Sequence, residues 1–145
     1  MGEKTIVRCA RVLKDGVGFV NVTGEVDTST ADSFRKELFH AIADTPKTLI
    51  VRLAHVSYMD SAGLAVLLEL VQAARKDNIH IVLLEPSEPA MRALDMVELD
   101  ALVQVCKSLD ACANKTRLDI HDIRHHTYVE EMSGNTSKVS TMDGA

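Results

Sequence analysis

Short apolar runs alternate with segments of helical periodicity between residues 48 and 84, and this alternation restricts the chain to few folds. Residues 49–53 read Leu-Ile-Val-Arg-Leu and residues 79–84 read Ile-His-Ile-Val-Leu-Leu, which is typical of buried strands. Between them, residues 62–76 carry leucine, valine and alanine at helical spacing. Strands that alternate with helices in this way favour a parallel sheet.

Two further strands are predicted before this unit. Residues 6–13 and 17–22 alternate loosely around Lys14-Asp15-Gly16, a turn signal, so we expect an antiparallel hairpin. Gly24-Glu25-Val26-Asp27 is expected to end the second strand. A helix should follow, because apolar residues then recur on one face of a helical wheel: Phe34, Leu38, Ala41 and Ile42.

A third helix is predicted to begin after Ser87, followed by a short strand over residues 101–105 and a short helix over 108–113. The sequence therefore predicts an α/β fold: one domain with a mainly parallel sheet, an antiparallel edge strand and helices packed on one face. We place this domain at residues 1–113. Residues 114–145 hold few large aliphatic side chains and are expected to form a flexible C-terminal tail, with at most a marginal helix around 119–132.

Composition narrows the classes of function. A formal net charge of -5 with no cluster of Lys or Arg argues against nucleic acid as the partner. The three cysteines form no C-x-x-C pair, which favours a reducing compartment. No apolar run reaches the length of a membrane span, and no signal-like stretch follows the N-terminus. We therefore expect a cytoplasmic protein without membrane contact.

Asp60-Ser61-Ala62-Gly63-Leu64 lies at the predicted turn from the central strand into the following helix. In one interpretation, Asp60 and Ser61 only cap that helix. In the other, Ser61 is a modification site, because the first N–H groups of a helix have no partner within the helix and favour an added phosphate. Asp27 follows an earlier strand in the same way, and both loops should open at one end of the sheet. Asp27 and Asp60 would then flank Ser61.

The helix after Ser61 is apolar on almost every face. Leu64, Leu67, Leu68, Val71 and Ala74 are predicted to form its core stripe. Val66 and Leu70 would then point elsewhere. They either pack against a neighbouring helix or form an apolar patch for a partner beside Ser61.

Other candidate sites are less specific. Ser87 is expected to cap a helix. His121, His125 and His126 are expected to be solvated residues and no metal ligands, and no cofactor is predicted. The chain has no G-x-S-x-G elbow and no glycine-rich phosphate-binding motif, so we expect no enzymatic activity.

Over about residues 4–113 the chain resembles the STAS domain (sulphate transporter and anti-sigma factor antagonist) of bacterial anti-sigma factor antagonists. The resemblance is carried by Gly24-Glu25-Val26-Asp27, the strand at 49–53, Asp60-Ser61-Ala62-Gly63-Leu64 and the block at 93–105. It implies a STAS-like fold. The tail at 114–145 departs from the pattern of the family, whose members commonly end near the last helix. The resemblance also raises a second phosphorylation site near Ser87, as an alternative to capping.

The resemblance further implies a partner switch. An anti-sigma factor with serine kinase activity would bind the unphosphorylated chain and release its sigma factor. It would also phosphorylate Ser61, and a phosphatase would reverse this. The expected partner-binding residues are Asp27, Asp60, Ser61, Ala62, Gly63, Leu64, Val66 and Leu70. The alternative function is a STAS scaffold or accessory subunit of a stress-signalling or lipid-transport complex.

Overall fold

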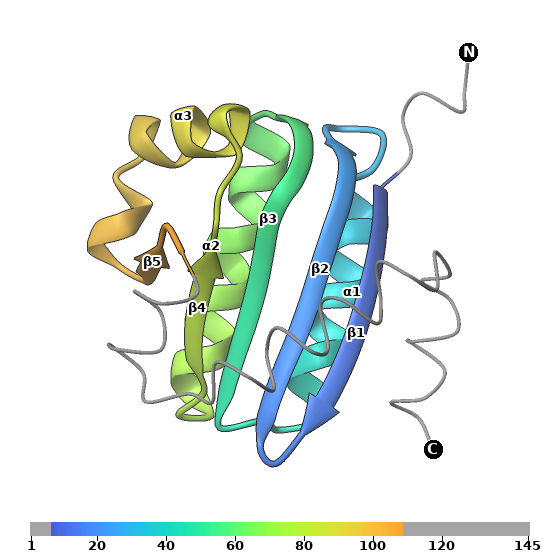
Figure 1. Cartoon of the computed structure of the whole chain (residues 1–145), viewed down its shortest axis with the longest axis vertical. Coiled ribbons are helices and arrows are strands. Elements are labelled where there is room, and N and C mark those ends of the chain that lie inside the picture. The colour runs from blue at the N-terminus through green and yellow to red at the C-terminus, as the bar shows by residue number, and fades with distance from the viewer. Residues whose placement is uncertain (1–6, 109–145) are drawn as a thin grey trace.

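One five-stranded sheet organises residues 7–108, the part of the chain that the computed structural model describes (Figure 1). Its strands are β1 (Val7–Lys14), β2 (Val17–Val26), β3 (Thr48–Met59), β4 (His80–Leu84) and β5 (Gln104–Cys106). The helices are α1 (Ala31–Ala43), α2 (Ser61–Lys76), α3 (Glu88–Met96) and the 3₁₀ turn η2 (Leu99–Ala101). The strands lie in sequence order; β1 is antiparallel to β2 and every other pair is parallel. This confirms the predicted α/β class with an antiparallel edge strand.

The hairpin between β1 and β2 forms where the sequence predicts it. Lys14 pairs with Val17, and the two residues between them, Asp15 and Gly16, have φ angles of 54° and 81°. Two-residue hairpin loops of type I′ require positive φ at both loop positions, and Asp-Gly meets this requirement at low cost. The turn therefore fixes the register of the edge strand.

β2 and β3 extend further than predicted, past Val22 to Val26 and past Leu53 to Met59. Gly24-Glu25-Val26 was expected to break the strand, but it continues the pairing, with Val26 opposite Met59. Two register shifts accommodate the extension, one of them directly after Gly24, whose φ is 116°. Such irregularities keep a strand paired while increasing its twist, and glycine adopts the required φ without strain. Because of this extension, the C-terminal ends of β2 and β3 lie side by side at one end of the sheet.

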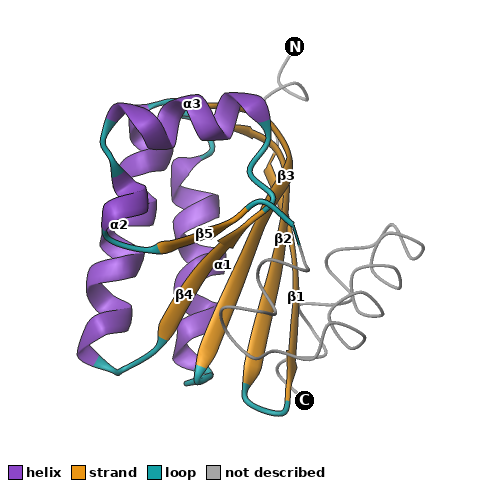
Figure 2. Cartoon of the chain, turned by 60° about the vertical axis from the view of Figure 1, so that its left-hand side comes forward, coloured by secondary structure: helices purple, strands orange, loops and turns teal. Residues whose placement is uncertain are grey.

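The main core lies between the sheet and the helices, which all occupy one side of it (Figure 2). The largest side chains that are completely removed from solvent there come from every layer: Phe34, Leu38, Leu49, Leu53, Leu67, Leu70, Leu83 and Leu94. α2 contacts α1 on one side and α3 on the other. An ion pair between Arg35 and Glu69, with 3.0 Å between Nε and Oε1, links α1 to α2 at the surface.

The position of α2 corrects two predictions about its faces. Val66 and Leu70 are 4% and 0% exposed, so the interpretation in which they form a partner-facing patch is wrong. Leu68, assigned to the core stripe, is instead 39% exposed. Because neighbouring helices flank α2 on two sides, its buried arc is wider than the single stripe that faces the sheet.

The end of the domain also differs from prediction. Residues 99–101 form η2, and β5 begins only at Gln104 rather than at residue 101. Leu99 is 1% exposed, which explains why this segment turns inward before the strand. The helix expected over 108–113 and the tail at 114–145 lie outside the described residues, apart from Ser108.

Leu70→Ala and Leu68→Ala form a matched pair that tests the faces of α2. Removing the fully buried Leu70 side chain should lower the free energy of unfolding by about 2–5 kcal/mol, because it leaves a cavity. The same truncation at the exposed Leu68 should cost less than about 1 kcal/mol. Urea unfolding of both variants measures the difference, and equal losses would contradict the assignment.

Candidate functional site

Ser61 is the first residue of α2, and its side chain is exposed. The residue before it, Asp60, has an extended backbone and acts as the N-cap: its Oδ1 accepts a hydrogen bond of 2.9 Å from the Ala62 N–H. Asp60 thereby satisfies one of the amide groups that a helix start leaves unpaired. Asp60 therefore caps the helix, and the Ser61 side chain is left at the surface.

The loop between β2 and α1 is organised around Asp27. Its Oδ1 accepts hydrogen bonds from the Ser29 hydroxyl at 2.7 Å, the Ser29 N–H at 2.9 Å and the Thr30 N–H at 3.2 Å. The hydrogen bond from the Ser29 hydroxyl is the main reason that the pKa of Asp27 is lowered. Donors that point at a carboxylate stabilise its ionised form. Asp27 is therefore held as a negative charge in a fixed place.

Thr30 anchors the same loop through its side-chain hydroxyl. Its hydroxyl donates to the Glu25 carbonyl at 2.8 Å and accepts from the Asp27 N–H at 2.9 Å. The Thr30 residue is only 4% exposed, so these bonds are shielded from water. They fix the exit of β2 relative to the start of α1.

The Asp27 loop and the Ser61 turn lie side by side. The Asp60 N–H donates to the Val26 carbonyl at 3.2 Å, which ties one turn to the other. The two turns border an open surface hollow of about 680 Å³, which reaches Asp60, the residue before Ser61. The hollow is lined by Glu25, Asp27, Thr28, Ser29, Ser57, Tyr58 and Asp60. As predicted, Asp27 and Asp60 come together at one end of the sheet. The edge of the domain beside Ser61 is therefore acidic.

Sequence reasoning did not assign five residues of this hollow to the site: Glu25, Thr28, Ser29, Ser57 and Tyr58. Glu25, Ser57 and Tyr58 were overlooked because β2 and β3 were expected to end earlier. Tyr58 is 48% exposed, an unusual position for one of the few aromatic side chains of this chain. The strand-forming run Val-Ser-Tyr-Met at 56–59 was the available signal that β3 continues.

Gly63 brings the first turn of α2 against the ends of β2 and β3. A Cβ atom at this position would lie 2.7 Å from Val26 Cγ1 and 3.0 Å from Met59 Cγ. Leu64 beside it is buried as well. Of the residues predicted to contact a partner, Asp27, Asp60, Ser61 and Ala62 are accessible, whereas Gly63, Leu64, Val66 and Leu70 are buried.

Ser87 is a helix cap, as expected from the sequence. Its hydroxyl donates to the Val56 carbonyl at 2.6 Å and accepts from the Ala90 N–H at 3.2 Å. The first bond holds the start of α3 against β3, and the second caps the helix. The hydroxyl is thus engaged in the fold, in contrast to that of Ser61.

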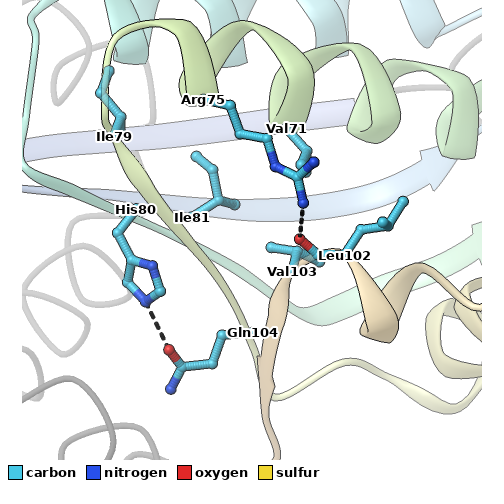
Figure 3. Close-up of a pocket in the computed structure, with 8 residues that line it drawn as sticks. All are labelled: Val71, Arg75, Ile79, His80, Ile81, Leu102, Val103 and Gln104. Carbon is cyan, nitrogen blue, oxygen red and sulfur yellow. Dashed lines mark hydrogen bonds between the residues drawn. The ribbon is translucent and has the colours of Figure 1, made fainter.

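A smaller hollow of about 130 Å³ lies at the other end of α2 from Ser61 (Figure 3). Arg75 reaches from α2 to donate to the Leu102 carbonyl at 3.1 Å, and His80 Nε2 meets Gln104 Oε1 at 2.7 Å. These contacts join the end of α2 and the start of β4 to the segment that enters β5. We assign this hollow a structural role.

Groups of metal-ligating side chains and membrane-spanning helices are both absent from the part of the chain that the structure describes. Across residues 7–108, no three His, Cys, Asp or Glu side chains are arranged to hold a metal ion. None of the helices in this range is long and apolar enough to cross a membrane. His121, His125 and His126 lie outside the described residues.

Known proteins resemble this chain in sequence and in fold. The sequence profile of the STAS domain matches residues 10–112, which includes the sheet, the helices and the Ser61 turn. The chain belongs to the STAS domain family. An anti-sigma-B factor antagonist of Bacillus subtilis (strain 168) is 31% identical over 86 residues, covering 59% of this chain and 78% of the relative.

Solved structures share the fold of this STAS domain. An anti-sigma factor antagonist from Mycobacterium paratuberculosis superposes with a TM-score of 0.68 at 23% identity, over 79% of this chain and 97% of that one. The anti-sigma factor antagonist SpoIIAA, in its unphosphorylated form, gives a TM-score of 0.56 at 18% identity, over 79% and 99%. At these identities the likeness establishes the architecture alone.

Gly63→Ala should destabilise the STAS domain by about 1–3 kcal/mol, because the added methyl group overpacks the contact with Val26. This loss should outweigh the gain that alanine brings in a helix. Urea unfolding measures it. In a double-mutant cycle with Val26→Ala, the space left by Val26 should relieve much of the Gly63→Ala effect. Strictly additive losses would contradict the close contact.

Asp27→Asn should reduce stability in a pH-dependent way. The folded-state pKa of Asp27 lies below the unfolded value of 3.8, so its ionised form stabilises the fold above that value. This contribution is lost as pH falls through the folded pKa. The difference in urea midpoint between wild type and Asp27→Asn should therefore be larger at neutral pH than at about pH 2.5. Asp95→Asn, at an exposed position of α3, is the matched control; an unchanged difference would contradict the role of Asp27.

Proposed function

We propose that this STAS domain is an anti-sigma factor antagonist whose binding is switched off by phosphorylation of Ser61. The observation that carries the proposal is the exposed Ser61 side chain at the first position of α2, beside an acidic hollow. The relatives named as anti-sigma factor antagonists support the role of the domain. In this role the chain binds and does not catalyse.

The position of Ser61 suits a switch that leaves the fold intact. A phosphate there meets the positive end of the α2 dipole and free helix N–H groups, so the helix start tolerates the new charge. The same phosphate adds roughly two negative charges to an edge that already carries Glu25, Asp27 and Asp60. A partner that accepts the neutral hydroxyl at this edge is then repelled.

The partner in this proposal is an anti-sigma factor with serine kinase activity. It binds the unphosphorylated domain, releases its sigma factor and transfers a phosphate from ATP to the Ser61 oxygen, leaving ADP. A phosphatase hydrolyses the phosphoserine and restores binding. SpoIIAA, which shares the fold, has been solved specifically in an unphosphorylated form, and this is consistent with a family regulated by phosphorylation.

An exposed stripe on α2 is the surface we assign to this partner. Ser61, Ala65 and Leu68 are all exposed and follow each other at i, i+4 and i+7, which places them on one face of the helix. In this proposal the stripe takes the partner-binding role that the sequence assigned to Val66 and Leu70, because those two residues are buried. Tyr58 extends the surface toward the hollow. Apolar contact along the stripe would supply affinity, and the charge state of Ser61 would control it.

Incubation with an anti-sigma kinase and ATP should add one phosphate to the wild-type chain and weaken its binding to that kinase by about tenfold or more. Intact-mass spectrometry measures the first effect and calorimetry the second. Ser61→Ala should gain no phosphate and keep its affinity. Ser57→Ala, which removes another exposed serine of the same edge, should still be phosphorylated.

Two further variants separate charge from size. Ser61→Glu should bind the kinase weakly, whereas Ser61→Gln, of similar size and without charge, should retain most of the affinity. A phosphate that is still added to Ser61→Ala would place the modification elsewhere. Equal affinities of the Glu and Gln variants would refute the electrostatic switch. Tight binding by all variants to a partner without kinase activity would instead favour the alternative of a STAS scaffold or accessory subunit.

A further inference from the structure

Thr30 stands at the N-cap of α1, yet its hydroxyl bonds with the end of β2. A threonine at this position ordinarily accepts a hydrogen bond from an N–H group in the first turn of its helix. Within residues 7–108, the Thr30 side chain makes no such capping bond. It donates instead to the Glu25 carbonyl at 2.8 Å and accepts from the Asp27 N–H at 2.9 Å. The hydroxyl therefore serves the loop before α1 and not the helix itself.

These two bonds lie on either side of Val26. Glu25 and Asp27 are its neighbours along the chain, so one hydroxyl fixes the backbone of all three residues. The Val26 carbonyl in turn accepts from the Asp60 N–H at 3.2 Å, one residue before Ser61. Through these contacts, a single side-chain oxygen sets the position of the acidic loop relative to the serine.

We propose that Thr30 is a positioning residue for recognition of the anti-sigma kinase, an inference that rests on the function proposed above. The residue is only 4% exposed, so its side chain offers a partner almost no surface of its own. It acts through Glu25 and Asp27, which line the hollow between the two turns. Carboxylates that are already fixed bind a complementary partner more tightly than mobile ones, because less conformational entropy is lost on binding.

The loop that Thr30 anchors also holds the charge of Asp27. The pKa of Asp27 is lowered mainly by the Ser29 hydroxyl, and the Thr30 N–H contributes in the same direction. These donors reach the carboxylate, at 2.7 and 3.2 Å, because the loop keeps its turn. Loss of the Thr30 hydroxyl should therefore let the pKa of Asp27 rise toward its ordinary value of 3.8.

Thr30→Val and Thr30→Ser form the deciding pair of variants. Valine keeps the shape of the side chain but removes the partner of the Glu25 carbonyl and the Asp27 N–H, whereas serine keeps the hydroxyl. In phosphorylation assays with an anti-sigma kinase and ATP, Thr30→Val should raise the KM for the domain at least about fivefold and leave kcat within about twofold. Thr30→Ser should keep KM within about twofold of the wild-type value.

A matched variant separates positioning from stability. Ile79→Val trims a buried side chain at the other end of α2, and its KM should equal that of the wild type. All variants are assayed under conditions where urea titration shows each of them to be fully folded. A second readout is the pKa of Asp27 from an NMR titration of its carboxyl carbon. This pKa should rise in Thr30→Val and stay unchanged in Thr30→Ser and Ile79→Val.

The outcomes distinguish this role from the proposed function. Equal KM values for wild type and Thr30→Val, or a KM of Thr30→Ser as high as that of Thr30→Val, would overturn the role of Thr30 and leave the proposed function in place. An unchanged Asp27 pKa in Thr30→Val would also overturn it, because the loop would then keep its position without the hydroxyl. A wild-type chain that no anti-sigma kinase of its own organism phosphorylates would overturn the proposed function, and this role with it.

Discussion

The contact between the first turn of α2 and the ends of β2 and β3 is the constraint on which the Ser61 site depends. Gly63 permits it, because any side chain at that position would collide with Val26. The hydrogen bond from the Asp60 N–H to the Val26 carbonyl closes the same contact. With the helix start fixed in this way, Ser61 and the Asp27 loop occupy neighbouring positions at the C-terminal ends of β2 and β3.

The chemistry of the site follows from a division of roles between adjacent residues. Asp60 uses its carboxylate to cap α2, and Asp27 is held by Ser29 and Thr30. Both charges are therefore fixed by the fold itself. Ser61 has an exposed side chain, and Asp60 rather than Ser61 is the N-cap, so a charge added to Ser61 would alter the surface far more than the structure. The proposed switch rests on this property.

The two faces of the sheet show how much burial depends on neighbours in space. On the helix side, α2 is flanked by α1 and α3, which buries Val66 and Leu70 together with the stripe that faces the strands. On the other side, Ile50 and Val82 are shielded although no described helix lies over them. Residues 49–51 of β3 and 81–84 of β4 are buried without interruption, and buried strands of parallel sheets have this pattern when both faces are covered.

The sequence by itself determined the order of helices and strands, the Asp-Gly hairpin turn, the sheet class and the Ser61 turn, because each depends on local periodicity or on turn chemistry. It also placed Asp27 and Asp60 at one end of the sheet, since the connectivity of parallel strands requires it. Only the tertiary structure decided where β2 and β3 end, which leucine of α2 is exposed and that Gly63 lies against Val26. These features depend on residues far apart in sequence that approach each other only in the folded chain, and no local pattern records them.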